Sequence, residues 1–398
     1  MSLPALFSPA AIGDLPLAHR VLMAPLTRFR ADAEHAPRAD IVAAYYAQRA
    51  CVKGTLLVSE ATFIAPQAGG YPHAPGIWSA AQIAAWKKVT AAVHAQGSFI
   101  YLQLWALGRA ALPHVLTAEL GPSDTSRYVS ASAIPLSARA DGPAPRPLSQ
   151  EEIAQYAAWY AQAAENAVVN AGFDGVEVHG ANGYLVDQFL QDVTNTRTDA
   201  YGGSVQNRAR FALEVIDAVV KRVGAHRTGL RLSPWSPFQD MGMADPVPTF
   251  TYLVKELLAR HPDLAYLHLT EKRLGTATPG GEIVSDDVFV AEGTENDFIR
   301  DIWTAAGKPL VTAGGYTRET GMRVAERKGD FIAYGRLFIS NPDLVFRLRE
   351  GLPLEKGDRS TYYTATDDPK GYTDYPFSKQ FLETNPGVAQ LGDVQSRL

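Results

Sequence analysis

Residues Gly175–Phe211 read GVEVHGANGYLVDQFLQDVTNTRTDAYGGSVQNRARF, and this stretch decides how the rest of the chain is interpreted. It opens with an apolar run typical of a buried strand and closes with the spacing of a helix. Two glycines allow the chain to turn sharply where the strand ends. His179 lies at that end, and Asn182 and Tyr184 follow within five residues. In β/α barrels, functional side chains occupy this position.

Short apolar runs, each followed by a segment with helical spacing, recur along the whole chain. They number eight, and they are nearly continuously apolar, as parallel strands covered on both faces must be. Eight such units favour a closed (β/α)8 TIM barrel over an open doubly wound sheet, which counting alone does not exclude. The predicted strands are Val21–Thr27, Thr55–Thr62, Phe99–Trp105, Gly175–Gly180, Gly229–Pro234, Tyr266–Thr270, Pro309–Gly314 and Phe331–Arg336.

Helices are predicted between these strands, for example over Ser79–Gln96, Ser149–Asn170 and Asn207–Val223. Ser149 is followed by Glu152 at the spacing of a capping box, which marks the start of the second of these helices.

Two stretches interrupt the alternation. Residues Ala110–Pro147 are rich in Pro, Ser and Ala, and Glu271–Thr294 are rich in Gly and Thr. Both are predicted to be long loops. Because each follows a strand end, we expect lids or pocket walls at the active face, not linkers between domains. A single domain over residues 1–398 is therefore predicted.

Composition excludes several classes of function. Lys and Arg number 37 against 42 Asp and Glu, so no excess of positive charge is available for nucleic acid or an anionic membrane. Cys51 is the single cysteine, which rules out an internal disulfide and agrees with a reducing compartment. No secretory signal or apolar run of membrane-spanning length is recognised. We expect a cytoplasmic protein without nucleic-acid or membrane partners.

His179, Asn182 and Tyr184 supply two hydrogen-bond donors for a carbonyl oxygen and a phenol that can deliver a proton. Polarising a carbonyl makes the β-carbon of a conjugated alkene electrophilic, so hydride can add there while a proton reaches the α-carbon. A lone His or Tyr near a strand end is more often structural. The clustering of all three between glycines favours catalysis.

The patterns HGANGYLVDQF and NTRTDAYGGS resemble the signature of the old yellow enzyme family. The resemblance covers nearly the whole chain and implies an FMN-binding barrel that works as an NAD(P)H-dependent ene-reductase, or NADPH dehydrogenase. By this resemblance His179 and Asn182 hold the activating oxygen of the substrate, and Tyr184 is the proton donor. NADPH over NADH is a family tendency only.

Four further positions are carried over from the family. In VLMAPLTRFRA, Pro25 would lie against the flavin and Thr27 would hydrogen-bond its O4 and N5 edge. Thr27 would also place the chain in the branch that has Thr in this position, where another branch has Cys. Ala61 would present its backbone to the flavin and narrow the pocket, since many relatives have Gly. Gln103 matches the amide that pairs with the pyrimidine edge.

Trp105 and Arg231 complete the predicted ring contacts. Trp105 matches a pocket wall that steers the substrate, although a buried core aromatic is an equal reading of the sequence. Arg231 is predicted at an inward position, where its charge needs a partner. By resemblance that partner is the N1 and O2 edge of the flavin, where negative charge gathers on reduction. A structural salt bridge is the alternative.

The last two strands are followed by Gly314 and Gly315 and by Gly335 and Arg336. Each pair alone is a weak signal of a turn. Across adjacent strands they indicate a cradle for one phosphate, which favours FMN over a dinucleotide. No GxGxxG follows a strand, so a Rossmann site is not supported.

In STYYTA, the family pattern implies that Tyr363 reaches the substrate pocket and Tyr362 lines it. The predicted substrates are small molecules, namely α,β-unsaturated carbonyl compounds and nitroalkenes, and no metal is predicted. The protein is expected to be a monomer or a homodimer. Two alternatives remain open: a sugar-phosphate aldolase, isomerase or lyase on the same barrel, and a flavin-binding protein without turnover. Neither a Schiff-base Lys nor a metal cluster is recognised for the first.

Overall fold

A computed structural model describes residues 3–121, 127–272, 295–388 and 391. Eight parallel strands form a closed ring, because each strand pairs with the next and the last pairs with the first. The (β/α)8 TIM barrel is confirmed. In ring order the strands are β3 (Val21–Met23), β4 (Leu56–Val58), β6 (Phe99–Trp105), β9 (Gly175–Gly180), β10 (Thr228–Leu232), β11 (Tyr266–Thr270), β12 (Leu310–Ala313) and β13 (Phe331–Tyr334).

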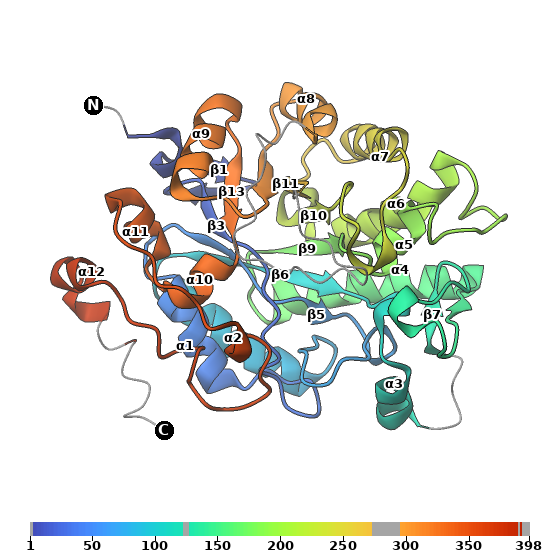
Figure 1. Ribbon diagram of the computed structural model, residues 1–398, viewed down its shortest axis with the longest axis horizontal. Helices are drawn as coiled ribbons and strands as arrows, with labels where there is room; N and C mark the ends of the chain where they lie inside the picture. Colours follow the sequence, from blue (N-terminus) through green and yellow to red (C-terminus); the bar gives the residue numbers. More distant parts are fainter. Residues whose placement is uncertain (1–2, 122–126, 273–294, 389–390, 392–398) are drawn as a thin grey trace.

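At least one helix lies between each strand of the ring and the next along the chain, and the long helices lie around the outside of the ring (Figure 1). The helices of the described residues are α1 (Ala39–Arg49), α2 (Ala80–His94), α3 (Pro113–Leu120), α4 (Gln150–Glu165), α5 (Leu185–Leu190), α6 (Val205–Val223), α7 (Val247–Arg260), α8 (Asp297–Ala305), α9 (Arg318–Lys328), α10 (Arg336–Ser340), α11 (Leu344–Glu350) and α12 (Lys379–Thr384). None of the helices in the described ranges combines the length and apolar character needed to cross a membrane.

Local sequence signals fix where the long helices begin. Ser149 caps α4, and its side chain and that of Glu152 form the predicted capping box. Ser79 and Gln82 make the same arrangement at the start of α2. The predicted helix Ser149–Asn170 is α4 followed by one π-helical turn, Asn166–Asn170.

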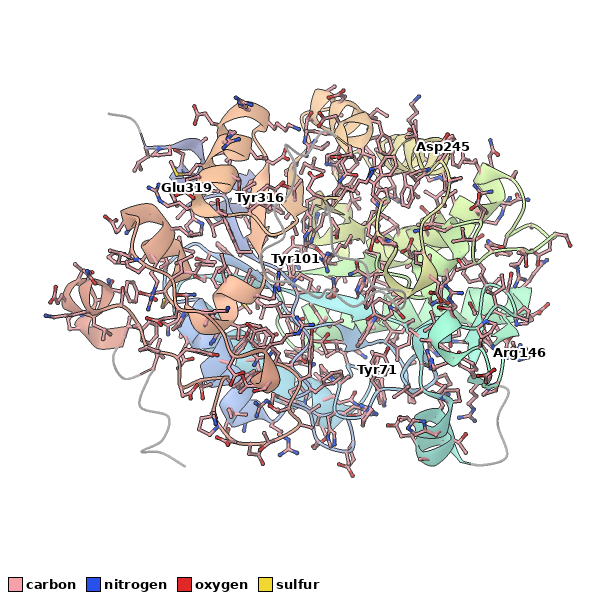
Figure 2. The ribbon with its side chains drawn as sticks, viewed as in Figure 1. Tyr71, Tyr101, Arg146, Asp245, Tyr316 and Glu319 are labelled. Carbon is pink, nitrogen blue, oxygen red and sulfur yellow. The ribbon has the colours of Figure 1, made fainter. Side chains whose placement is uncertain are left out.

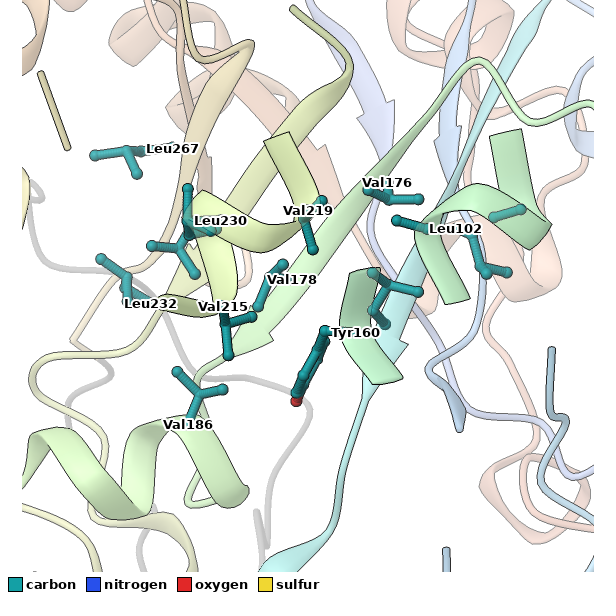
Figure 3. Close-up of a cluster of buried hydrophobic side chains, with 14 of the residues drawn as sticks. Leu102, Tyr160, Val176, Val178, Val186, Val215, Val219, Leu230, Leu232 and Leu267 are labelled. Carbon is teal, nitrogen blue, oxygen red and sulfur yellow. The ribbon is translucent and has the colours of Figure 1, made fainter. Parts of the chain in front are cut away.

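Alternate residues of each strand face two different cores. Val176 and Val178 of β9 point outward and pack, together with Leu102 of β6, against Tyr160 of α4 and Val215 of α6 (Figure 3). Burying each aliphatic side chain contributes about 1.5–3 kcal/mol, so this outer layer holds the helices on the barrel. The residues between them point into the ring.

The amino-terminal end of the ring is filled by side chains. Hairpin strands β1 (Ala10–Ile12) and β2 (Leu15–Leu17) pack Ile12 against Tyr101 and Tyr266, whose rings lie 5.7 Å apart. Tyr101 appears at the centre of the molecule in Figure 2. A site for a ligand is therefore expected at the opposite, carboxyl end.

Several predicted boundaries need correction. The predicted strand Val21–Thr27 ends at Met23, and Thr55–Thr62 divides into β4 and the short β5 (Thr62–Phe63). The predicted loop Ala110–Pro147 contains α3 and the paired strands β7 (Val129–Ser130) and β8 (Arg146–Pro147). Pro113 at the first turn starts α3, a signal that the richness in Pro obscured. Of the predicted loop Glu271–Thr294, residues 273–294 lie outside the described residues.

Candidate active site

Three of the predicted site residues lie at the carboxyl ends of consecutive strands. Trp105 is the last residue of β6, and His179 is the last but one of β9. Arg231 of β10 is directly opposite His179 in the strand register. All three therefore share one rim of the barrel, where the sequence placed them.

The rings of Trp105, His179 and Tyr184 are in mutual contact. Tyr184 meets Trp105 edge to face, with ring centroids 4.9 Å apart and planes inclined by 89°. It meets His179 at the same centroid distance and an inclination of 68°. Trp105 and Ala61, a predicted flavin contact, belong to one buried apolar cluster, on which Tyr184 packs. The structure therefore brings four predicted site residues together.

His179 is a neutral hydrogen-bond donor. It is buried, and burial lowers its pKa well below the ordinary value, with a further contribution from the charge of Arg231. The backbone N–H of Ala181 donates to His179 Nδ1 at 3.4 Å. Because Nδ1 accepts, the proton of the neutral ring resides on Nε2. Nε2–H can then donate to an oxygen of a ligand.

Tyr184 keeps its proton over the whole physiological range. Burial raises its pKa well above 10, and the neighbouring phenols of Tyr71 and Tyr363 add to this rise. The side chain of Gln239 hydrogen-bonds Tyr184 and opposes the shift only in part. The phenol can therefore serve as a general acid, but it does not ionise spontaneously.

The turn that carries Asn182 is held in place by three hydrogen bonds to its backbone groups. Asn182 has a φ of 57°, a left-handed conformation that Asn tolerates better than most residues. Its N–H donates to Ser233 Oγ at 2.7 Å, and its carbonyl accepts from Gln239 Nε2 at 2.7 Å. The N–H of Gly183 donates to the buried Asp187 carboxylate at 2.9 Å. These three supporting residues carried no signal in the sequence.

Gln103 lies one layer below the rim, whereas Arg231 lies at the rim opposite His179. Gln103 is buried on β6 and donates its amide N–H to Glu177 Oε1 at 2.7 Å. The Nε atom of Arg231 is buried and has no hydrogen-bond partner. A buried donor atom that stays unused is costly unless a ligand completes its contacts. This orphaned donor fits the acceptor edge of a flavin.

The other predicted cofactor residues border the same rim. Pro25 and Thr27 are half-buried in the segment after β3, and Gly314 and Gly315 follow β12. Gly315 is exposed and has a φ of 86°, which side chains rarely adopt.

Gly335 precedes α10, which begins at Arg336 after β13, and β12 pairs with β13. A Cβ at Gly335 would approach Leu26 Cδ2 to 3.3 Å, so the backbone is closely packed there. The two predicted phosphate segments are thus neighbours in space.

Tyr362 and Tyr363 diverge although they are adjacent in the chain. Tyr363 is 59% exposed, and its ring lies 6.0 Å from that of Phe29. Tyr362 is buried against the guanidinium of Arg28. Tyr363 therefore lies beside Phe29 and acts on Tyr184, whereas Tyr362 packs on Arg28.

Two aromatic residues that the sequence analysis missed complete the wall. Phe29 has a φ of 55°, and its ring lies 6.3 Å from that of Tyr71. Tyr71, labelled in Figure 2, meets Trp105 edge to face at 5.7 Å. A left-handed Phe is uncommon. Its backbone conformation cannot be read from the sequence, so the sequence held no local signal for this residue. In the described ranges, no group of three or more His, Cys, Asp or Glu side chains could hold a metal ion.

Comparison with known proteins decides the family. A family model described as the NADH:flavin oxidoreductase / NADH oxidase family matches residues 5–355. The crystal structure of an old yellow enzyme from Pichia sp. AKU4542 superposes with a TM-score of 0.83 at 38% identity, covering 94% of each chain. The protein belongs to the old yellow enzyme family.

Two further proteins are similar to this chain over nearly their whole length. The chanoclavine-I aldehyde reductase of Penicillium roqueforti (strain FM164) is 53% identical over 388 residues, covering 96% of this chain and 99% of that protein. A morphinone reductase solved in complex with tetrahydroNAD has a TM-score of 0.81 at 40% identity, covering 95% of this chain and 99% of that one.

Membership of the old yellow enzyme family makes this chain an FMN-dependent oxidoreductase that takes its electrons from a reduced nicotinamide. The residues present fit the cofactor. Gln103 offers an amide, Arg231 offers a guanidinium whose buried Nε has no hydrogen-bond partner, and two adjacent glycine-bearing segments border the rim.

Proposed function

We propose that this old yellow enzyme family member is an ene-reductase that reduces the activated C=C bond of α,β-unsaturated carbonyl compounds and nitroalkenes, with Tyr184 as the proton donor. The observation that carries the proposal is the pairing of a neutral, Nε2-protonated His179 with a protonated Tyr184 at one strand end. When bound, FMN accepts hydride from NAD(P)H and supplies it to the substrate.

His179 and Asn182 perform the activation. The Nε2–H of His179 and the side-chain amide of Asn182 donate to the carbonyl or nitro oxygen of the substrate, which draws electron density away from the β-carbon. Because His179 is neutral, it stabilises the developing negative charge without surrendering its own proton. The hydrogen bonds to Ser233 and Gln239 hold the backbone of Asn182 in place before substrate arrives.

Tyr184 completes the addition. Its raised pKa means that the phenol releases its proton only to a carbon that has become strongly basic, which is the α-carbon after hydride addition. Trp105, Tyr71 and Phe29 supply apolar surface beside it, suited to a planar conjugated substrate.

An aldehyde is the favoured activating group. The relative named chanoclavine-I aldehyde reductase is 53% identical to this chain over 388 residues, and that name supports an aldehyde as the activating group.

The test follows the visible absorbance of the flavin in the purified protein. Denaturation should release FMN, and anaerobic NADPH or NADH should bleach the visible flavin band. Cinnamaldehyde, cyclohexenone and nitrostyrene, added one at a time to the reduced protein, should restore the band and yield the saturated product in one turnover.

Each negative result would favour a different function or a narrower substrate class. A colourless protein that gains no visible absorbance in FMN would favour sugar-phosphate chemistry on the same barrel. Bleaching without reoxidation by any of the three alkenes would favour a flavin-binding protein without this turnover. Reoxidation by the nitroalkene alone would remove the carbonyl substrates from the proposal.

A further inference from the structure

A second buried cluster lies inside the barrel, one layer below His179. Glu177 of β9 has no exposed surface, and its carboxylate accepts three hydrogen bonds from inward-facing side chains. Oε1 accepts from Gln103 Nε2 at 2.7 Å, and Oε2 accepts from Tyr266 Oη at 3.0 Å and from His268 Nδ1 at 2.8 Å. The ene-reductase chemistry proposed above uses neither Glu177 nor His268.

Glu177 is charged and His268 is neutral. Burial alone would raise the pKa of Glu177, but the hydrogen bond from His268, the charge of Arg231 and the hydrogen bond from Gln103 hold it below its usual range. Burial lowers the pKa of His268, so its bond to Glu177 is that of a neutral Nδ1–H donor. The carboxylate is thus an acceptor at every contact.

This fixes the orientation of Gln103. An ionised carboxylate can only accept, so the atom of the Gln103 amide that faces it must be the nitrogen. The amide oxygen and the second N–H are left for a ligand at the rim. Without the carboxylate, either end of the amide could face the same ligand.

The same charge acts on Arg231. Arg231 faces His179 in the strand register, two residues along β9 from Glu177. Glu177 favours the charged form of the guanidinium, yet within the described residues no ion pair within 4.0 Å joins the two. Arg231 therefore keeps its donors for a ligand while the carboxylate offsets part of its field.

We propose that Glu177 is a positioning residue for the flavin: it selects which end of the Gln103 amide meets the ring, and it lowers the reduction potential by offsetting the charge of Arg231. This inference rests on the FMN site proposed above for Gln103 and Arg231. Reduction adds negative charge to the ring, so an uncompensated Arg231 favours the reduced form and a nearby carboxylate opposes it.

Glu177→Gln tests both parts. The variant removes the charge and gives position 177 an amide that can meet either end of Gln103. We expect FMN to bind about tenfold more weakly, measured by fluorescence titration of deflavinated protein. The equilibrium between oxidised and reduced flavin should shift about tenfold toward the reduced form, about 30 mV for a two-electron couple, measured against a reference dye.

Glu177→Asp separates the two effects. The shorter side chain keeps the charge but loses its reach to Gln103, so FMN binding should weaken while the potential stays within a factor of two of wild type. Asp330→Asn is the matched control, because Asp330 is a buried carboxylate paired with Arg300 and, in the part of the chain that the structure describes, no hydrogen bond or ion pair joins it to this cluster. Asp330→Asn should leave the FMN affinity and the equilibrium between oxidised and reduced flavin within twofold of wild type.

The results are decisive in either direction. A potential that is unchanged or more negative in Glu177→Gln overturns the charge role, and unchanged FMN affinity in Glu177→Asp overturns the positioning role. If neither variant folds while Asp330→Asn does, Glu177 serves the fold and the inference fails. A wild-type protein that binds no FMN would instead refute the proposed function.

Discussion

The imidazole of His179 and the phenol of Tyr184 meet edge to face, with ring centroids 4.9 Å apart. One turn of chain therefore delivers a neutral donor and a protonated acid to the same space. His179 lies at the end of β9, and Tyr184 is the residue directly before α5. One short segment of chain therefore positions both side chains. The chemistry expected of this pair leads to the first prediction.

Tyr184→Phe should separate the two half-reactions. The ring and its contact with Trp105 remain, so the fold and hydride transfer from NADPH should be within twofold of wild type. Loss of the phenolic proton should slow reoxidation by an unsaturated aldehyde by about a hundredfold or more. Stopped-flow absorbance of the flavin follows each step separately, and equal loss in both would refute the role given to Tyr184.

Gln239→Ala should impair catalysis without removing any group that touches substrate. The variant loses the Nε2–H bond to the Asn182 carbonyl and the hydrogen bond to Tyr184, so both the phenol and a left-handed residue that costs of order 1–3 kcal/mol are less firmly held. We expect reoxidation to slow by about tenfold or more because the donors move out of line. Gln155→Ala, on the exposed face of α4, is the control. Wild-type reoxidation in Gln239→Ala would show that Ser233 suffices.

The parts of the fold that the sequence predicted are those set by short-range physics. Apolar runs placed β6, β9 and β11 at their observed bounds, and Ser149 with Glu152 marked the start of α4. These signals depend on residues within one turn or one strand. The family resemblance named Trp105 and His179 as site residues, and the structure brings their ring centroids to 6.4 Å from each other.

The parts that were missed depend on closure of the barrel. Glu177 looked like one more residue of a strand until β9 and β11 brought it to His268. Gln239 lies more than 50 residues from Asn182, and nothing in either segment indicates the bond between them. Some strand ends were overestimated because apolar residues continue past the strand, as Ala24, Pro25 and Leu26 do after Met23.

Arg28→Lys should loosen the segment that carries Tyr363. The Arg28 guanidinium donates to the carbonyls of Tyr362, Thr361 and Gly371 at 2.9, 3.3 and 2.8 Å. A lysine cannot reproduce this planar set of donors, and carbonyls left unsatisfied in the interior destabilise by about 1–3 kcal/mol.

Limited proteolysis followed by mass spectrometry should show new cleavage within residues 359–374 of Arg28→Lys, and KM for the aldehyde should rise severalfold. Arg359→Lys changes an exposed arginine of the same segment and should resemble wild type. Identical cleavage patterns in all three proteins would exclude a clamping role for Arg28.

Because of His19, the folded protein should be less stable in mild acid than at neutral pH. It is buried below the barrel, where its Nδ1 accepts from the Val21 N–H at 3.2 Å and its Nε2 lies 3.0 Å from Thr55 Oγ1. Thr55 Oγ1 already donates to the Val52 carbonyl, so Nε2–H is the donor and the ring is held neutral at both nitrogens.

The sign of the effect follows from where the proton binds. Burial lowers the pKa of His19 from 6.5 to about 4, so below pH 6.5 the unfolded chain takes up a proton that the folded chain refuses. The stabilising contribution is complete above pH 6.5 and is lost as the pH falls toward 4. Between pH 6.5 and pH 5 the loss should be about 2 kcal/mol.

Urea unfolding at pH 8, 6.5 and 5 measures this term. His19→Gln should be less stable than wild type at pH 8, because one of the two hydrogen bonds is lost, but it should lose less stability on acidification. His94→Gln should behave in the opposite sense, because a hydrogen bond with Asp174 raises the pKa of the half-exposed His94, so its protonated form stabilises the fold. If wild type and His19→Gln lose the same free energy of unfolding between pH 6.5 and pH 5, His19 is charged in the folded protein.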